Sequence, residues 1–204
     1  MTERGDAEPA VGADGVQGRR QPVVNVANAL TILRIVLVPL FVVVMVASGM
    51  ASPGYRMAAA LAFIIASLTD FADGWIARSF DQVTAFGKVA DPIADKALTG
   101  TALILLSLYG ALPWWVTAVV LVRELGVTGL RLWVLNTAVV AASRGGKAKT
   151  VLQTVAIAWY IWPFTDALAA VGPWLMAVAV VVTVVTGVDY VVRVLRVRRS
   201  GRPG

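Results

Sequence analysis

Four aspartates in an otherwise apolar region are the residues of this sequence best suited to chemistry. Asp70 and Asp73 are three residues apart and Asp91 and Asp95 are four apart, so each pair shares one face of a helix. Four carboxylates held together at low dielectric constant repel one another strongly unless cations neutralise them. Their oxygens suit Mg²⁺ or Mn²⁺, and two such ions in one carboxylate cluster promote in-line displacement at phosphorus. The spacing therefore predicts a two-metal centre for phosphoryl transfer.

The composition excludes most other kinds of site. The 204 residues include no cysteine and no histidine, which rules out thiol nucleophiles, disulfides and imidazole metal ligands. A general base must then be a carboxylate or a rarer group. Hydrophobic residues make up 58% of the chain, charged residues only 15%, and the mean hydropathy is +0.77. These values are far from those of a soluble domain and indicate a membrane protein.

Six apolar stretches, each about long enough to cross a bilayer, are separated by glycine and proline. They predict an all-α fold, an integral membrane bundle of six transmembrane helices. The expected helices lie near residues 28–49, 57–80, 88–109, 114–137, 149–164 and 173–195. Residues 1–22 are expected to form a disordered cytosolic tail, residues 23–198 the membrane domain, and residues 199–204 a basic C-terminal tail.

The positions of lysine and arginine predict the orientation, because cytoplasmic connections carry an excess of them. The N-terminal segment, the second-to-third and fourth-to-fifth connections and the chain end are basic, whereas the opposite connections hold only Arg56. Both termini are therefore expected in the cytoplasm, with the protein in the cytoplasmic membrane and the aspartates facing the cytoplasm. Anionic lipid headgroups explain the net charge of +6, so no nucleic-acid partner is expected.

The segment that holds the aspartates resembles the signature of the CDP-alcohol phosphotransferase family. Residues 70–95 read DFADGWIARSFDQVTAFGKVADPIAD and fill every fixed position of the pattern D-x2-D-G-x2-A-R-x8-G-x3-D-x3-D. The resemblance implies a six-helix membrane fold, usually a homodimer, with two divalent cations. It also implies transfer of a phosphatidyl or similar group from a CDP-linked donor to an alcohol, with release of CMP.

The family's residue roles carry over to the matching positions. Asp70, Asp73 and Asp91 would be metal ligands, and Asp95 would bind the second metal and deprotonate the acceptor hydroxyl. Small or polar residues would contact the donor, and they are Gly74, Ala77, Arg78, Thr84 and Gly87.

The start of the first predicted helix adds candidates for the donor site. Asn28, Thr31 and Arg34 match the opening N-x-L-T-x2-R, which resembles the family branch that uses glycerol 3-phosphate. In that branch the early polar residues help to hold the CDP-lipid. The spacing of Asn28 and Thr31 permits a plain helix cap equally well.

Cations in the fourth and fifth stretches are candidates for the acceptor site. Arg123 lies in an apolar run and needs a partner, while its neighbour Glu124 is expected to point elsewhere on the helix. The partner of Arg123 could be a carboxylate of the aspartate cluster, a bound phosphate, or an acidic residue that forms a structural ion pair with it. Lys147 and Lys149 open the next helix, where phosphate binding and anchoring at the cytoplasmic surface both explain them.

The same two segments resemble the glycerol 3-phosphate branch. The run VRELGVTGLRLW at residues 122–133 is followed by the pattern G-K-x-K-T-x2-Q, which ends at Gln153. The resemblance implies attack of the primary hydroxyl of glycerol 3-phosphate on the lipid-bearing phosphorus of CDP-diacylglycerol. The cations expected to hold the acceptor phosphate are Arg123, Lys147 and Lys149, with Arg34 or Arg131 as helpers.

Two other acceptors and one different function remain as alternatives. Two other branches keep the aspartates and use an inositol phosphate or phosphatidylglycerol as the acceptor. The basic cluster at residues 144–149 favours a phosphorylated acceptor over phosphatidylglycerol, and it does not separate inositol phosphate from glycerol phosphate. An ion-coupled transporter is more remote, because such proteins show internal repeats and broken helices at the bilayer midplane, whereas these acids are expected near one surface.

Overall fold

The computed structural model describes the backbone of residues 26–79, 85–134 and 144–200, and side chains at residues 32–69, 93–131, 133 and 146–196. These ranges contain seven helices and no strand, which confirms the all-α prediction for the described part of the chain. The helices are α1 (Val26–Ser48), α2 (Pro53–Ser79), α3 (Ala85–Leu108), α4 (Trp114–Val134), α5 (Arg144–Ile161), α6 (Asp166–Ala169) and α7 (Val171–Ser200).

The six long helices coincide with the six predicted stretches, and the differences lie at their ends. Helix α2 starts earlier than predicted, at Pro53, because proline fits the first helical position, where its missing N–H costs nothing. Helix α5 starts earlier, at Arg144, so the predicted basic cluster lies in its first turns. It ends at Ile161, since Pro163 disfavours helical geometry at the residue before it. The one-turn helix α6 was not predicted.

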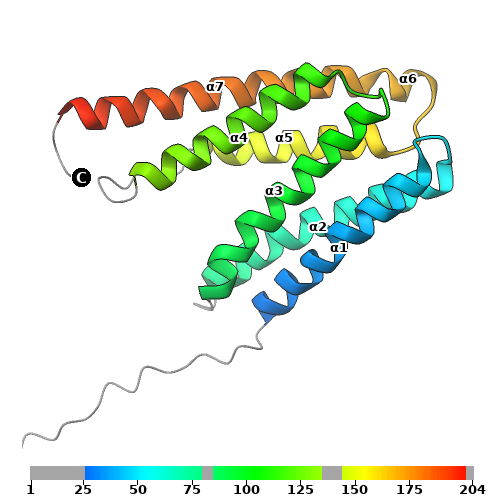
Figure 1. Ribbon diagram of the computed structural model, residues 1–204, viewed down its shortest axis with the longest axis horizontal. Coiled ribbons are helices and arrows are strands. Elements are labelled where there is room, and N and C mark those ends of the chain that lie inside the picture. The colour runs from blue at the N-terminus through cyan, green and yellow to red at the C-terminus, as the bar shows by residue number, and fades with distance from the viewer. Residues whose placement is uncertain (1–25, 80–84, 135–143, 201–204) are drawn as a thin grey trace, which may run out of the picture.

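Helix α3 joins two groups of helices (Figure 1). Helix α1 packs along α2, while α5 and α4 both pack on α7. Helix α3 contacts α1 and α2 on one side and α4 and α5 on the other. Helices α2 and α5 also contact each other, and Asp91 and Asp95 lie on α3, which meets two helices of each group.

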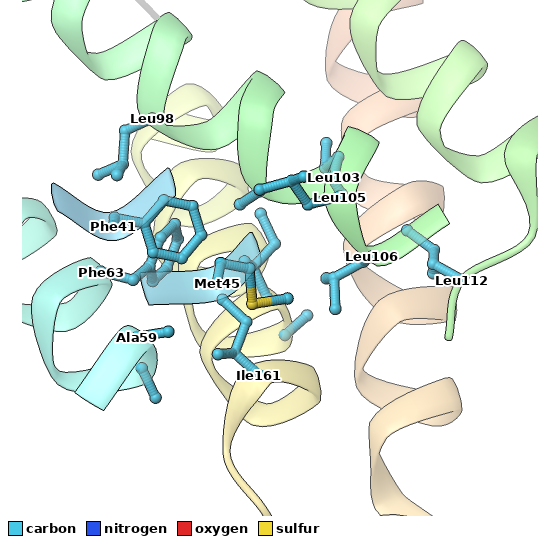
Figure 2. Packing of buried hydrophobic residues seen from close by; sticks show 14 of the residues in the cluster. Phe41, Met45, Ala59, Phe63, Leu98, Leu103, Leu105, Leu106, Leu112 and Ile161 are labelled. Carbon is cyan, nitrogen blue, oxygen red and sulfur yellow. The ribbon is translucent and has the colours of Figure 1, made fainter. Parts of the chain in front are cut away.

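Aromatic and small side chains form the core where α1, α2 and α3 meet. The ring centroids of Phe41 and Phe63 are 5.7 Å apart, and Met45 and Leu98 are buried beside them (Figure 2). Buried alanines on α2, among them Ala59, leave room for α1 to approach closely, as small residues do in membrane bundles. This packing fixes the positions of the helices that carry the aspartates.

The exterior of the bundle is strongly apolar. Within the described residues, one helical segment, Asp166–Arg196, is long and apolar enough to span a bilayer, with a mean hydropathy of 2.4 over an 18-residue stretch within it. Two shorter apolar helical segments are Ile32–Ser48 and Pro53–Thr69. Large hydrophobic side chains are exposed on every long helix, for example Val43, Leu68 and Val122. Contiguous apolar exposure of this kind is what contact with lipid or a partner requires.

Arg56 ties the start of α2 to the end of α5. Its Nε donates to the carbonyl of Ile161 at 3.2 Å, and its Nη2 donates to the carbonyls of Tyr160 and Trp162, both at 3.1 Å. The last carbonyls of a helix have no partner within the helix, and the helix dipole favours a cation beside them. Arg56 therefore caps α5 from another helix.

Replacing Arg56 is expected to weaken the fold without changing substrate binding. Arg56→Ala should lower the free energy of unfolding by about 2 kcal/mol, because three carbonyls lose a charged donor. Arg56→Lys should regain only part of this, since an ammonium lacks the planar fork that reaches several carbonyls. Thermal unfolding in detergent measures the effect, with the KM of each substrate as the control. A melting temperature of Arg56→Ala equal to that of the wild type would contradict the capping role.

Candidate active site

The four aspartates occupy matching levels on two helices in contact. Asp73 lies six residues before the end of α2 and Asp91 six residues after the start of α3, which is about 9 Å along each axis. Asp70 and Asp95 lie nine and ten residues from the same ends, at about 14–15 Å. Asp73 and Asp91 are therefore nearer to the connection between α2 and α3 than Asp70 and Asp95 are. The side chains of Asp70, Asp73 and Asp91 lie outside those described, so their convergence stays a prediction.

The predicted donor-binding residues lie near the same helix ends. Helix α1, which carries two of them, packs against α2 and α3, which carry four more. For the residues in helices the structure describes the backbone and not the side chains. Thr84 lies outside the described residues altogether. The residues in helices are Asn28, Thr31, Gly74, Ala77, Arg78 and Gly87.

A polar cavity of about 50 Å³ lies between α3, α4 and α5, beside Asp95. Leu103 of α3 and Val120 of α4 form part of its apolar wall. Its principal polar lining is Asp95, Lys96, Thr99, Glu124, Lys149 and Gln153. The structure thus brings Asp95, the predicted base, and Lys149, one of the cations predicted to hold the acceptor phosphate, into the same cavity.

Glu124 is the centre of an ion-pair network in this cavity. Its Oε1 accepts hydrogen bonds from Arg123 Nη1, at 3.0 Å, and from Lys149 Nζ, and its Oε2 lies 3.6 Å from Lys96 Nζ. The expectation that Glu124 points away from Arg123 is therefore wrong, because the long Arg123 side chain reaches its neighbour's carboxylate. Of the residues in this network, Lys96, Glu124 and Lys149 line the cavity together with Asp95, so its walls carry two carboxylates and two ammonium groups.

Arg123 also joins α4 to α7. Its Nε donates to the carbonyl of Thr183 at 3.1 Å, and its Nη2 donates to Thr186 Oγ1 at 3.0 Å. Its stem passes so close to Gly187 that a Cβ there would lie 3.0 Å from Arg123 Cγ, which explains a glycine at this position. Arg123 therefore forms the structural ion pair that the sequence allowed, while its contact with a substrate phosphate stays a prediction.

The other predicted acceptor cations are in different surroundings. Arg34 of α1 is fully buried, and its charge, like those of Lys96 and Lys149, acts on the Asp95 carboxylate. Lys147 is exposed in the first turns of α5. Arg131 is exposed and lies over the ring of Tyr190, with 5.9 Å between its Cζ and the ring centroid. Arg34, Lys147 and Arg131 are not among the residues that line the polar cavity.

The chemistry of the available donors fits a hard divalent cation. A chain without histidine or cysteine offers carboxylate oxygens, the ligands that Mg²⁺ and Mn²⁺ prefer. Among the side chains described, acidic groups do not gather in threes or more. Three of the four predicted ligands lie outside that set, and Asp95 stands at the wall of the polar cavity.

A second cavity has a different character. It measures about 350 Å³ and lies between α2 and α5, next to the segment that follows α5. Its walls include Leu68, Val155, Trp159 and Phe164, and no charged side chain is among its described lining residues. Of these two cavities, only the polar cavity has charged side chains among its described lining residues.

Glu124 and Lys96 are not among the site residues predicted from the sequence. Both carry a signal that could have been used, since an ionisable residue inside an apolar run is a functional candidate by default. Lys96 directly follows Asp95, and Glu124 stands in an otherwise apolar helix. What the sequence lacked was the contact between α3, α4 and α5 that brings them together.

Comparisons with known proteins agree with the aspartate pattern. The model of the CDP-alcohol phosphatidyltransferase family matches residues 24–185. A protein of Mycobacterium tuberculosis named "probable phosphatidylglycerophosphate synthase" is 47% identical over 190 residues, which cover 93% of this chain and 90% of that protein. Two proteins named CDP-diacylglycerol–glycerol-3-phosphate 3-phosphatidyltransferase are 40% identical, in Bacillus subtilis, and 38% identical, in Escherichia coli. They match over 81% of this chain and 93% and 92% of their own lengths.

The match of the family model covers most of the chain, including all four aspartates and the helices around the polar cavity. The expected family is thereby confirmed: this chain belongs to the CDP-alcohol phosphatidyltransferases.

Proposed function

We propose that the protein transfers the phosphatidyl group of CDP-diacylglycerol to glycerol 3-phosphate, forming phosphatidylglycerophosphate and releasing CMP. The observation that carries this proposal is the cavity beside Asp95, because it brings the ammonium groups of Lys149 and Lys96 next to the predicted base. An acceptor that carries both a phosphate and a hydroxyl suits such a cavity. The Bacillus subtilis and Escherichia coli relatives are named for transfer to glycerol 3-phosphate, and the Mycobacterium tuberculosis relative is named for the product, which supports the choice.

The acceptor side of the reaction follows from the residues of the polar cavity. Asp95 takes the proton of the primary hydroxyl as its oxygen attacks the lipid-bearing phosphorus, and the bond to the oxygen of the leaving CMP breaks in line. Glu124 holds the ammonium of Lys149 in place for the acceptor phosphate. The further cations proposed for that phosphate are Arg123, Lys147, Arg34 and Arg131.

The donor side involves the ends of α1, α2 and α3. Asp70, Asp73, Asp91 and Asp95 would hold two divalent cations, Mg²⁺ or Mn²⁺, which when bound neutralise the diphosphate and stabilise the charge that develops on CMP. The residues proposed to contact the cytidine diphosphate or the lipid-linked phosphate are Asn28, Thr31, Gly74, Ala77, Arg78, Thr84 and Gly87.

The six long helices are proposed to cross the cytoplasmic membrane, with both termini and the active site at its cytoplasmic face. The shortest of them, α5, has 18 residues and spans about 27 Å, close to the thickness of a hydrocarbon core. The apolar exterior supports this placement. Residues 1–22 would be a cytosolic tail, residues 23–198 the membrane domain and residues 199–204 a basic tail, in a protein that forms homodimers.

An acceptor panel tests the proposed function. Purified protein in detergent, with CDP-diacylglycerol and Mg²⁺, is expected to release CMP with glycerol 3-phosphate and not with inositol 1-phosphate, phosphatidylglycerol or serine. The physical reason is that the ammonium groups of Lys149 and Lys96 suit an acceptor phosphate, while Asp95 lies in the same cavity for the hydroxyl. Release with inositol 1-phosphate alone would keep the role of the aspartates and overturn the assigned acceptor.

A further inference from the structure

Gln153 has a buried polar atom that the fold itself does not use. The residue is only 3% exposed, and its Oε1 accepts no hydrogen bond from the described residues. A buried carbonyl oxygen without a donor is costly, and most buried polar groups in proteins are satisfied. The side chain therefore calls for an explanation outside the packing of α5.

The position of Gln153 links this atom to the acceptor site. Gln153 follows Lys149 by four residues on α5, so the two side chains share one face of the helix. Both line the polar cavity together with Asp95 and Glu124. Thr183 Oγ1 is also buried without a partner among the described residues, but Thr183 does not line this cavity.

The size and lining of the cavity suit the hydroxyl-bearing part of a small molecule. A volume of 50 Å³ has room for about three or four groups the size of a water molecule. Glu124 is already occupied by three cations, whereas Gln153 Oε1 is free to accept. Gln153 Oε1 is thus a hydrogen-bond acceptor, without a donor among the described residues, in a lining that also includes Lys149 and Asp95.

We propose that Gln153 Oε1 accepts a hydrogen bond from the secondary hydroxyl of glycerol 3-phosphate, which makes Gln153 a specificity-determining residue. This inference rests on the proposed function. With Lys149 on the phosphate and Asp95 on the primary hydroxyl, the hydroxyl of the middle carbon is the remaining polar group of the acceptor. The contact selects phosphorylated alcohols that carry a second hydroxyl beside the attacking one.

The test compares glycerol 3-phosphate with 3-hydroxypropyl phosphate, which keeps the phosphate and the primary hydroxyl and lacks the secondary hydroxyl. The wild-type protein is expected to prefer glycerol 3-phosphate by about 10- to 100-fold in kcat/KM, because the analogue leaves Gln153 Oε1 buried and unsatisfied. Gln153→Leu should reduce this preference to about 3-fold or less and leave the KM of CDP-diacylglycerol unchanged. Its melting temperature should stay at or above that of the wild type, because the variant removes an unsatisfied carbonyl.

Two further variants separate specificity from folding. Gln153→Met keeps an unbranched side chain of similar length and should lose the preference in the same way, even if the branch of leucine disturbs the packing. Thr117→Val removes a buried hydroxyl that bonds Ser107 Oγ at 2.7 Å and the carbonyl of Leu103 at 3.1 Å, and Thr117 itself does not line the polar cavity. It should lower the melting temperature and keep the wild-type preference.

The outcomes distinguish this inference from the proposed function. Release of CMP by the wild type with neither acceptor would overturn the proposed function. Release with both acceptors at equal kcat/KM, or an unchanged preference in Gln153→Leu and Gln153→Met, would overturn the role of Gln153 and leave the proposed function standing.

Discussion

Asp95→Asn is expected to lower the rate of CMP release by at least about 10³-fold, because the amide can neither take the proton of the acceptor nor replace a carboxylate beside the divalent cations. Asp95 lines the polar cavity, and the charges of Lys96, Lys149 and Arg34 act on it. The measurement is CMP release in detergent with CDP-diacylglycerol and glycerol 3-phosphate, at saturating concentrations of both. Membrane yield and melting temperature establish that the variant is folded.

Asp189→Asn provides the matched control for this variant. Asp189 is on α7, about half exposed, and its Oδ2 pairs with Arg193 Nη2 at 2.9 Å, four residues further along the helix. An exposed pair of this kind contributes little to stability, so this variant should keep activity within about 2-fold of the wild type. Undiminished turnover in Asp95→Asn would remove Asp95 from the role of base.

The second large effect is expected from Lys149→Met. It should raise the KM of glycerol 3-phosphate by about 30-fold, since a charged hydrogen bond to the acceptor phosphate is lost, and change the KM of CDP-diacylglycerol by less than about 3-fold. The Lys149 side chain is 7% exposed, and its ammonium pairs with Glu124 inside the polar cavity. Methionine preserves most of the buried stem, so the variant tests the charge and not the volume. Initial rates at varied concentrations of each substrate give the two constants.

Lys147→Met is the comparison that the chain itself offers. Lys147 is two residues earlier on the same helix and exposed, and it does not line the polar cavity. The Lys147→Met variant should raise the KM of glycerol 3-phosphate much less than Lys149→Met does. An equal rise in the KM of both substrates for Lys149→Met would contradict its assignment to the acceptor.

Much of the fold and the family could be predicted from the sequence, because both depend on local patterns. The spacing of Asp70, Asp73, Asp91 and Asp95 is a short-range property, and the two helices that carry them are adjacent in the chain. The apolar stretches predicted the six long helices for the same reason. The predicted helix ends were less accurate, for example at Pro53, where α2 begins. The position of an end depends on which residue starts or stops a hydrogen-bonded turn.

The acceptor side could be predicted only in part, because it depends on contacts between segments far apart in the chain. Helical periodicity places Lys149 and Gln153 on one face of α5, but it does not say that this face meets α3 and α4. The sequence also treats Lys147 and Lys149 alike, although one is exposed and the other buried. The partners of Glu124 come from three helices and follow only from the packing.

The cap that Arg56 places on α5 has a consequence for biogenesis. In the proposed topology Arg56 reaches the outer surface with α2, yet the nearest of its carbonyl partners is 104 residues later in the chain. At a translation rate of about 5–20 residues per second, α2 waits roughly 5–20 s before the ribosome has made the end of α5. Membrane insertion of α2 therefore proceeds without this contact. The contact forms only once α5 has docked, and it marks the late assembly of the bundle instead of the entry of its first helices into the bilayer.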